Sequence, residues 1–83
     1  MFSDPPISPA QIRAARGLLG WTQQELARRV GVRRLAIQRI ELEISKPRLG
    51  TVARIRQVFA EAGVFFERGG AVLGAKDPSN EGS

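Results

Sequence analysis

Apolar residues recur every three or four positions in four stretches of the chain, a spacing that places them on one face of an α-helix. Polar and charged residues fill most of the positions between them. The four apolar faces consist of Ile12, Ala15 and Leu19; Leu26, Ala27 and Val30; Val32, Ala36, Ile37 and Ile40; and Val52, Ile55, Val58 and Phe59. With 83 residues in total, the sequence predicts one domain with a single small helical core.

Residues that begin and end helices mark the limits of these stretches. Ser8 and Thr22 are followed three positions later by Gln11 and Glu25, the capping-box arrangement that satisfies backbone N–H groups at a helix start. The far ends carry glycines that can adopt the left-handed conformation, Gly20, Gly31 and Gly63. We therefore expect helices over about 8–19, 22–30, 33–41 and 49–62.

The pattern changes to that of short strands after residue 63. Two apolar runs flank the pair Gly69-Gly70, which predicts a β-hairpin with a two-residue glycine turn. An isolated hairpin is marginally stable in water, so its apolar residues need a partner. We favour dimerisation through this element, whereas the alternative is that it covers the core of its own chain. The residues assigned to the dimer interface are Val64, Phe65, Phe66, Val72 and Leu73.

The chain is thus expected to divide into an N-terminal arm (1–7), a helical domain (8–63), the hairpin (64–73) and a disordered tail (74–83). The tail is predicted from its Gly, Pro, Ser, Asn and charged residues, without aromatic residues.

Several kinds of function are disfavoured by composition. The chain has no Cys and no His, which excludes disulfides, thiolate or imidazole metal sites and His-based catalytic triads. No nucleophile and base pair is apparent, so no enzyme, cofactor or metal is expected, and no small-molecule effector site is evident. No apolar run approaches the roughly 20 residues of a membrane helix, and the N-terminus lacks a signal-peptide pattern. We expect a cytoplasmic protein without a membrane partner.

Positive charge is concentrated in the helical part of the chain. Residues 9–58 contain eleven Lys and Arg but three Glu, a net charge of +8 against +5 for the whole chain. Such a patch favours a nucleic acid as the partner. An acidic protein surface is a weaker alternative, and anionic lipid the weakest, because the basic residues do not flank one continuous apolar face.

Residues 22–41 have the pattern of two short helices joined by a glycine-containing turn. Val32, Ala36, Ile37 and Ile40 would face inward, which leaves arginines and a glutamine on the outer face of the second helix. This arrangement can place a helix in the DNA major groove, where Arg pairs with guanine and Gln with adenine. The alternative is an antiparallel helix pair whose basic face is merely solvated.

Residues 8 to about 63 resemble the Cro/repressor-type, or XRE-like, helix-turn-helix family. The resemblance rests on Arg16, Thr22-Gln23-x-Glu25-Leu26-Ala27, Gly31-Val32, Ile37-x-x-Ile40-Glu41 and Pro47-x-Leu49 with Thr51. It implies a compact all-α, lambda-repressor-like domain of four to five helices, to which the predicted C-terminal β-hairpin or strand is appended.

The resemblance also implies roles for individual residues. The base edges of DNA would be met by Arg34, Leu35 and Arg39, flanked by Arg33 and Gln38. The sugar-phosphate backbone would be contacted by Thr22, Gln23, Lys46 and Arg48. Arg16 and Glu41 would form a structural ion pair between the first and third helices.

Two positions depart from the family pattern. Arg33 stands where the family has a Ser or Thr cap, so the recognition helix loses a side-chain acceptor at a cost of about 1 kcal/mol. Glu43 and Ile44 stand where a glycine is common, so the geometry of residues 42–47 is left open.

The sequence therefore predicts a sequence-specific double-stranded DNA-binding regulator of transcription, most simply a repressor that binds a palindromic operator as a homodimer. The alternative is an antitoxin or adaptor that binds a partner protein, such as a toxin, through the C-terminal strands.

Overall fold

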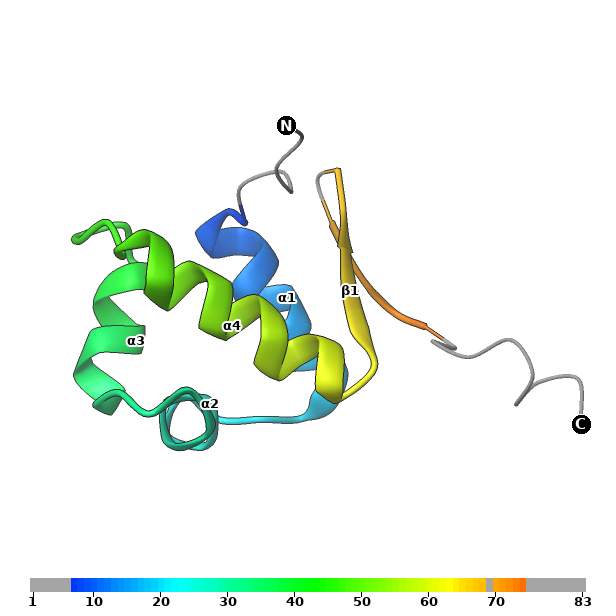
Figure 1. Ribbon diagram of the computed structural model, residues 1–83, viewed down its shortest axis with the longest axis horizontal. Helices are drawn as coiled ribbons and strands as arrows, with labels where there is room; N and C mark the ends of the chain where they lie inside the picture. Colours follow the sequence, from blue (N-terminus) through cyan, green and yellow to red (C-terminus); the bar gives the residue numbers. More distant parts are fainter. Residues whose placement is uncertain (1–6, 69, 75–83) are drawn as a thin grey trace, which may run out of the picture.

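The computed structural model describes residues 7–68 and 70–74, without the side chains of Val72 and Leu73. Four helices are followed by a two-stranded antiparallel sheet (Figure 1). The elements are α1 (Pro9–Leu19), α2 (Gln23–Val30), α3 (Arg34–Glu41), α4 (Leu49–Glu61), β1 (Val64–Glu67) and β2 (Gly70–Leu73). The predicted all-α domain with a C-terminal hairpin is thereby confirmed. The arm before Ile7 and the tail after Gly74 lie outside the described residues.

The starts of α1 and α2 are capped by the predicted side chains, but only α1 closes its capping box. The hydroxyl of Ser8 accepts the N–H of Gln11, whose side chain accepts the N–H of Ser8 in return. The hydroxyl of Thr22 accepts the N–H of Glu25 at 3.0 Å. The Glu25 carboxylate does not return the bond, because it accepts from Arg28 and Arg29 at 2.6 and 2.7 Å. The prediction of a second capping box was therefore wrong, since two guanidinium groups one turn away attract the carboxylate more strongly.

Glycines end α1 and α2 as predicted. Gly20 and Gly31 are the C-caps and lie in the left-handed region, with φ of 69° and 93°. Gly63, with φ of 90°, reverses the chain after α4 and leads into β1.

The third helix ends in a left-handed turn built on a glutamate. Among the described residues, Glu43 is the non-glycine residue with positive φ, at 63°. Its N–H donates to the carbonyl of Ile40 at 3.0 Å, and the N–H of Ile44 donates to the carbonyl of Arg39 at 2.8 Å. These two bonds form a Schellman motif, which usually has glycine at the left-handed position. The chain therefore makes the glycine-type helix end without glycine, at a cost in backbone strain.

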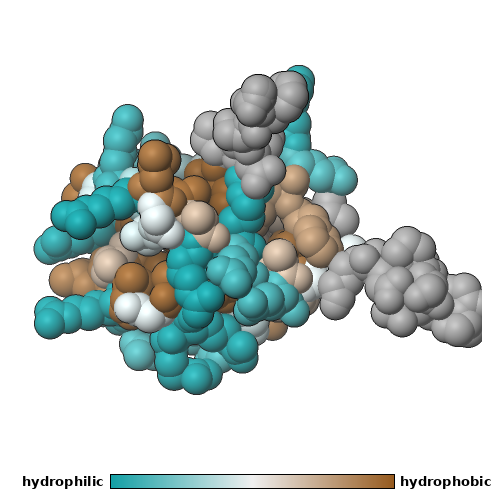
Figure 2. Space-filling model, viewed as in Figure 1, coloured by the Kyte–Doolittle hydropathy of each residue, from teal (hydrophilic) through white to brown (hydrophobic). Residues whose placement is uncertain are grey.

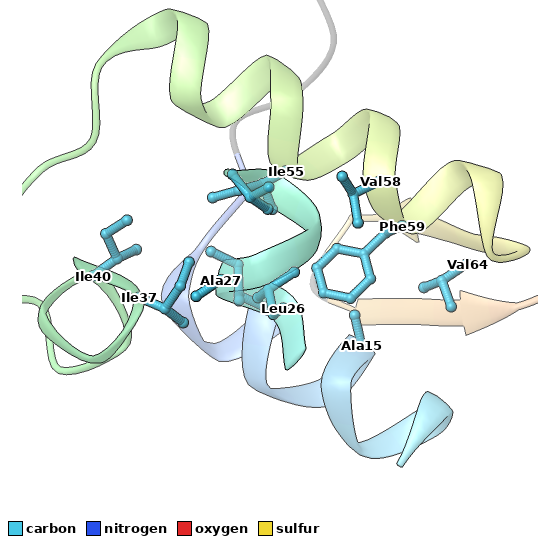
Figure 3. Packing of buried hydrophobic residues seen from close by; sticks show 11 residues of the cluster. Ala15, Leu26, Ala27, Ile37, Ile40, Ile55, Val58, Phe59 and Val64 are labelled. Atoms are coloured by element: carbon cyan, nitrogen blue, oxygen red, sulfur yellow. The ribbon is translucent and has the colours of Figure 1, made fainter. Parts of the chain in front are cut away.

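One core joins all four helices and the hairpin (Figure 3). Phe59 of α4 is fully buried at its centre. The Phe59 ring stacks on Trp21 and meets the edge of Phe66, with centroid distances of 5.6 Å in both cases. The buried apolar residues are Ile12, Ala15, Leu26, Ala27, Val30, Ile37, Ile40, Ile55, Val58, Phe59 and Val64. Every predicted apolar face contributes to this set.

The hairpin packs against its own chain, on α1 and α4. The side-chain amide of Gln11 donates to the carbonyls of Glu67 and Gly70, at 2.6 and 2.8 Å, and so joins α1 to both strands. Val64 is 1% exposed and belongs to the core. Phe65 points to the opposite face of the strand and is 39% exposed.

The turn of the hairpin lies one residue earlier than predicted. Glu67 pairs with Gly70 in the register of the two strands, so Gly70 is the first residue of β2 and not part of the turn. The sequence predicted Gly69-Gly70 instead. Gln11 holds this register, because its amide nitrogen donates to the carbonyls of both Glu67 and Gly70.

Candidate nucleic-acid interface

The two helices of the predicted motif are joined by a tight turn. The N–H groups of Gly31 and Val32 both donate to the carbonyl of Ala27, at 2.8 and 3.0 Å. Leu26 and Ala27 of α2 and Ile37 of α3 are fully buried together, so the two helices pack on one core through their inner faces. The outer face of α3 is thereby held in a fixed orientation relative to α2.

A buried carboxylate fastens α3 to α1. Glu41 is 2% exposed, and its two oxygens accept from Nε and Nη2 of Arg16 at 2.7 and 2.8 Å. The predicted ion pair is confirmed. The hydrogen bond to Glu41 raises the pKa of Arg16 above its usual value, so the guanidinium stays charged. Nη1 of Arg16 also donates to the carbonyl of Trp21 at 3.0 Å, which attaches the loop before α2 to the same pair.

Arg13 adds a contact that sequence reasoning missed. Its guanidinium donates to the backbone carbonyl of Glu41, at the end of α3 where a positive charge is favoured. Arg13 precedes Arg16 by three positions in a helix, so both side chains can reach the same neighbour. That spacing was the available signal in the sequence.

The predicted base-contacting residues lie together on and beside α3. Arg33, Arg34 and Arg39 are exposed, Leu35 is 46% exposed, and Gln38 is half-buried. No side chain caps the start of α3 at Arg33, as the departure from the family pattern predicted. An exposed cationic surface around one exposed leucine can offer hydrogen-bond donors and one apolar contact to a DNA groove.

Gln23 connects the buried ion pair to this surface. Its amide nitrogen donates to Oε1 of Glu41 at 3.0 Å, and its amide oxygen accepts from Nη1 of Arg34 at 3.4 Å. Nη1 of Arg34 also donates to the amide oxygen of Gln38 at 3.1 Å. A continuous chain of polar contacts therefore runs from the interior to the outer face of α3.

The residues predicted to contact the DNA backbone surround this surface. Thr22 is exposed at the start of α2, and its hydroxyl hydrogen is available after the oxygen has accepted the N–H of Glu25. Lys46 and Arg48 are exposed in the connection between α3 and α4. Hydrophilic side chains project from the α2 and α3 end of the molecule in Figure 2.

Comparison with known families agrees with this geometry. Residues 12–61 match the Helix-turn-helix family of Cro/C1 (XRE) type. The match covers more than half of the chain, so the chain belongs to this family, whose domain binds DNA. A comparison with curated proteins found no match. Within residues 7–68 and 70–74, no helix has the length and apolar character needed to cross a membrane.

Proposed function

We propose that the protein is a sequence-specific regulator of transcription that represses by occupying a palindromic operator as a homodimer. The observation that carries this proposal is the exposed cationic face of α3, which is locked to the core through Glu41. A rigid helix with outward arginines suits the major groove, because its donors can reach base edges with little loss of conformational entropy on binding. Binding, rather than catalysis, is its activity, and its place of action is the cytoplasm.

Each group of residues has a distinct role in this proposal. Arg34 and Arg39 read guanine, and Leu35 meets the methyl group of thymine. Arg33 and Gln38 extend the reading surface to either side. The phosphates are held by Thr22, Gln23, Lys46 and Arg48. These phosphate contacts position the protein on DNA but carry no sequence information.

The homodimer is supported by the outer face of the hairpin. Within the part of the chain that the structure describes, each strand pairs with one neighbour, so both have an edge that can accept another strand. Phe65 lies on the outer face and is 39% exposed. Val64 is taken up by its own core and Phe66 in part, so among the described side chains of β1 Phe65 is the apolar one available for a contact between subunits.

The experiment that tests this function is selection of bound duplexes from a random pool by the purified chain, at about 150 mM salt to suppress non-specific binding. We expect an inverted repeat whose half-sites lie about 10 base pairs apart. Failure to enrich any sequence would contradict sequence-specific binding.

Variants then separate base reading from phosphate contact on the selected site. Arg34→Ala should relax the preference at one base pair, at a cost of about 1–3 kcal/mol, whereas Lys46→Ala should weaken all sequences to a similar degree. Arg68→Ala is the matched control, because this exposed arginine lies in the hairpin turn, away from α3. Equal losses for Arg34→Ala and Lys46→Ala on selected and random DNA would refute the assignment of α3 as the reading helix.

The second candidate function is that of an antitoxin or adaptor, which uses the same strand edges for a different protein. If a second copy does not occupy the exposed Phe65 and the open strand edges, a strand of a different protein can bind there. Sedimentation of Phe65→Ser distinguishes the two. A wild-type dimer that dissociates on this change supports the homodimer. A monomeric wild type would instead favour the adaptor function for the hairpin.

A further inference from the structure

The connection between α3 and α4 carries a patch of exposed apolar side chains. Among the described residues, six large apolar side chains are exposed, and three of them lie within residues 42–49. These three are Leu42, Ile44 and Leu49, which are 59%, 67% and 88% exposed. We call them the loop patch. Exposed apolar side chains that gather in one place are typical of a contact with another protein.

The loop patch borders an apolar groove between this connection and α4. Pro47, Val52 and Ala53 line the groove together with Leu49, whereas Leu42 and Ile44 stand outside it. One surface therefore carries both exposed apolar side chains and a hollow that can receive such side chains. Two identical copies related by a two-fold axis need this combination, because each copy must supply both halves of the contact.

The charges of the same segment suit a second copy as well. Glu43 and Lys46 are exposed, and Glu43 forms no ion pair with a described residue. Residues 9–58 carry a net charge of +8, so two copies repel one another over most of this domain. At the loop patch, Glu43 of each copy can approach Lys46 of the other, and this pairing opposes the repulsion.

The loop patch and the hairpin lie at opposite ends of the described chain (Figure 1). In a homodimer joined through the hairpin, the two loop patches are therefore at the outer ends. Each patch shares its segment with Lys46 and Arg48, the residues proposed to hold phosphates, so it lies beside the DNA. A dimer bound to its operator then presents a patch toward a dimer on the next operator.

We propose that the loop patch joins neighbouring dimers on DNA, so that the protein binds adjacent operators cooperatively. The partner at this surface is a second copy of the same chain. Hairpin and patch contacts would then alternate in an open row along the duplex. This inference rests on the proposed function and adds a contact that a single operator does not use.

The test compares DNA that carries one selected operator with DNA that carries two. The separation of the two operators increases by one base pair at a time over a full helical turn, and footprint titration gives the occupancy of each. We expect a filled first operator to tighten binding at the second by about 5- to 150-fold. The effect should appear where both dimers lie on the same face of the duplex and vanish half a turn away.

Two variants assign this cooperativity to the loop patch. Ile44→Ser and Leu49→Ser should abolish it without changing the affinity for one operator, because both side chains are exposed and neither is assigned to DNA. Leu18→Ser is the matched control, since this leucine is 43% exposed on α1 and lies outside the loop patch. It should keep the cooperativity of the wild type.

Independent binding of the wild type at every separation would overturn the inference, and so would full cooperativity in Ile44→Ser and Leu49→Ser. Weaker binding of these variants to a single operator would also overturn it, because the patch would then join the two copies on one operator. A wild type that selects no operator at all would instead refute the proposed function, so the two failures are distinguishable.

Discussion

Replacing Glu43 with glycine should stabilise the protein. A residue with a side chain costs about 1–2 kcal/mol in the left-handed conformation, and Glu43 has φ of 63°. Glycine removes this strain but loses about 0.5–1 kcal/mol, because its unfolded chain is freer. Removing a negative charge from the C-terminal end of α3 adds about 0.3 kcal/mol at this exposed position. The net gain is about 1 kcal/mol.

Urea denaturation measures this gain directly. For Glu43→Gly we expect a higher midpoint at an unchanged slope, and a melting temperature raised by about 4–8 °C. Glu43→Ala is the matched control, because it removes the charge but keeps a side chain in the left-handed region. Equal stabilisation by alanine and glycine would show that charge, not backbone strain, limits the helix end. No gain from glycine would refute the reasoning entirely.

Three further predictions concern the polar contacts. Glu41→Ala should destabilise by about 3–5 kcal/mol in urea denaturation, and replacing both Arg16 and Glu41 by Met and Leu should recover most of the loss, because no charge is then left unpaired. The hydrogen bond from Arg28, reinforced by Arg29, lowers the pKa of Glu25 below its usual value of 4.5. The ionised carboxylate therefore stabilises the fold above pH 4.5, and this contribution is lost as the pH falls through the lowered pKa. Glu25→Gln should remove this part of the fall in unfolding free energy at low pH. An unchanged fall in denaturation experiments at several pH values would contradict the prediction. Gln11→Glu can still accept the N–H of Ser8 but cannot donate to the hairpin, so hydrogen exchange should quicken in the strands and stay unchanged at the start of α1.

The helices could be predicted because their signals are local. Ser8, Thr22, Gly20 and Gly31 act through backbone groups within four residues, and each performs its predicted role. The turn after α3 could not be predicted from the sequence, since Glu43 adopts a left-handed conformation that its residue type disfavours.

The polar contacts between distant elements were the main features that the sequence did not predict. Gln11 had a local interpretation as a capping residue, and nothing in the pattern indicated that its amide nitrogen would reach carbonyls more than fifty positions away. The register of the hairpin is held by this same amide nitrogen, which contacts both strands, and the glycine pair alone did not place the turn. Arg16 and Glu41 are the exception, because the resemblance to the family carried that contact.

The stacking of Trp21 on Phe59 gives the protein an internal optical reporter. The chain has one tryptophan and no tyrosine, so its near-ultraviolet fluorescence comes almost entirely from this indole. The guanidinium of Arg29, a residue of α2, lies 4.4 Å from the centroid of the Trp21 ring. Emission from a single position therefore senses both the integrity of the core and the surroundings of α2. We expect DNA binding at α2 to change this emission, so folding and binding could both be followed in the unlabelled chain.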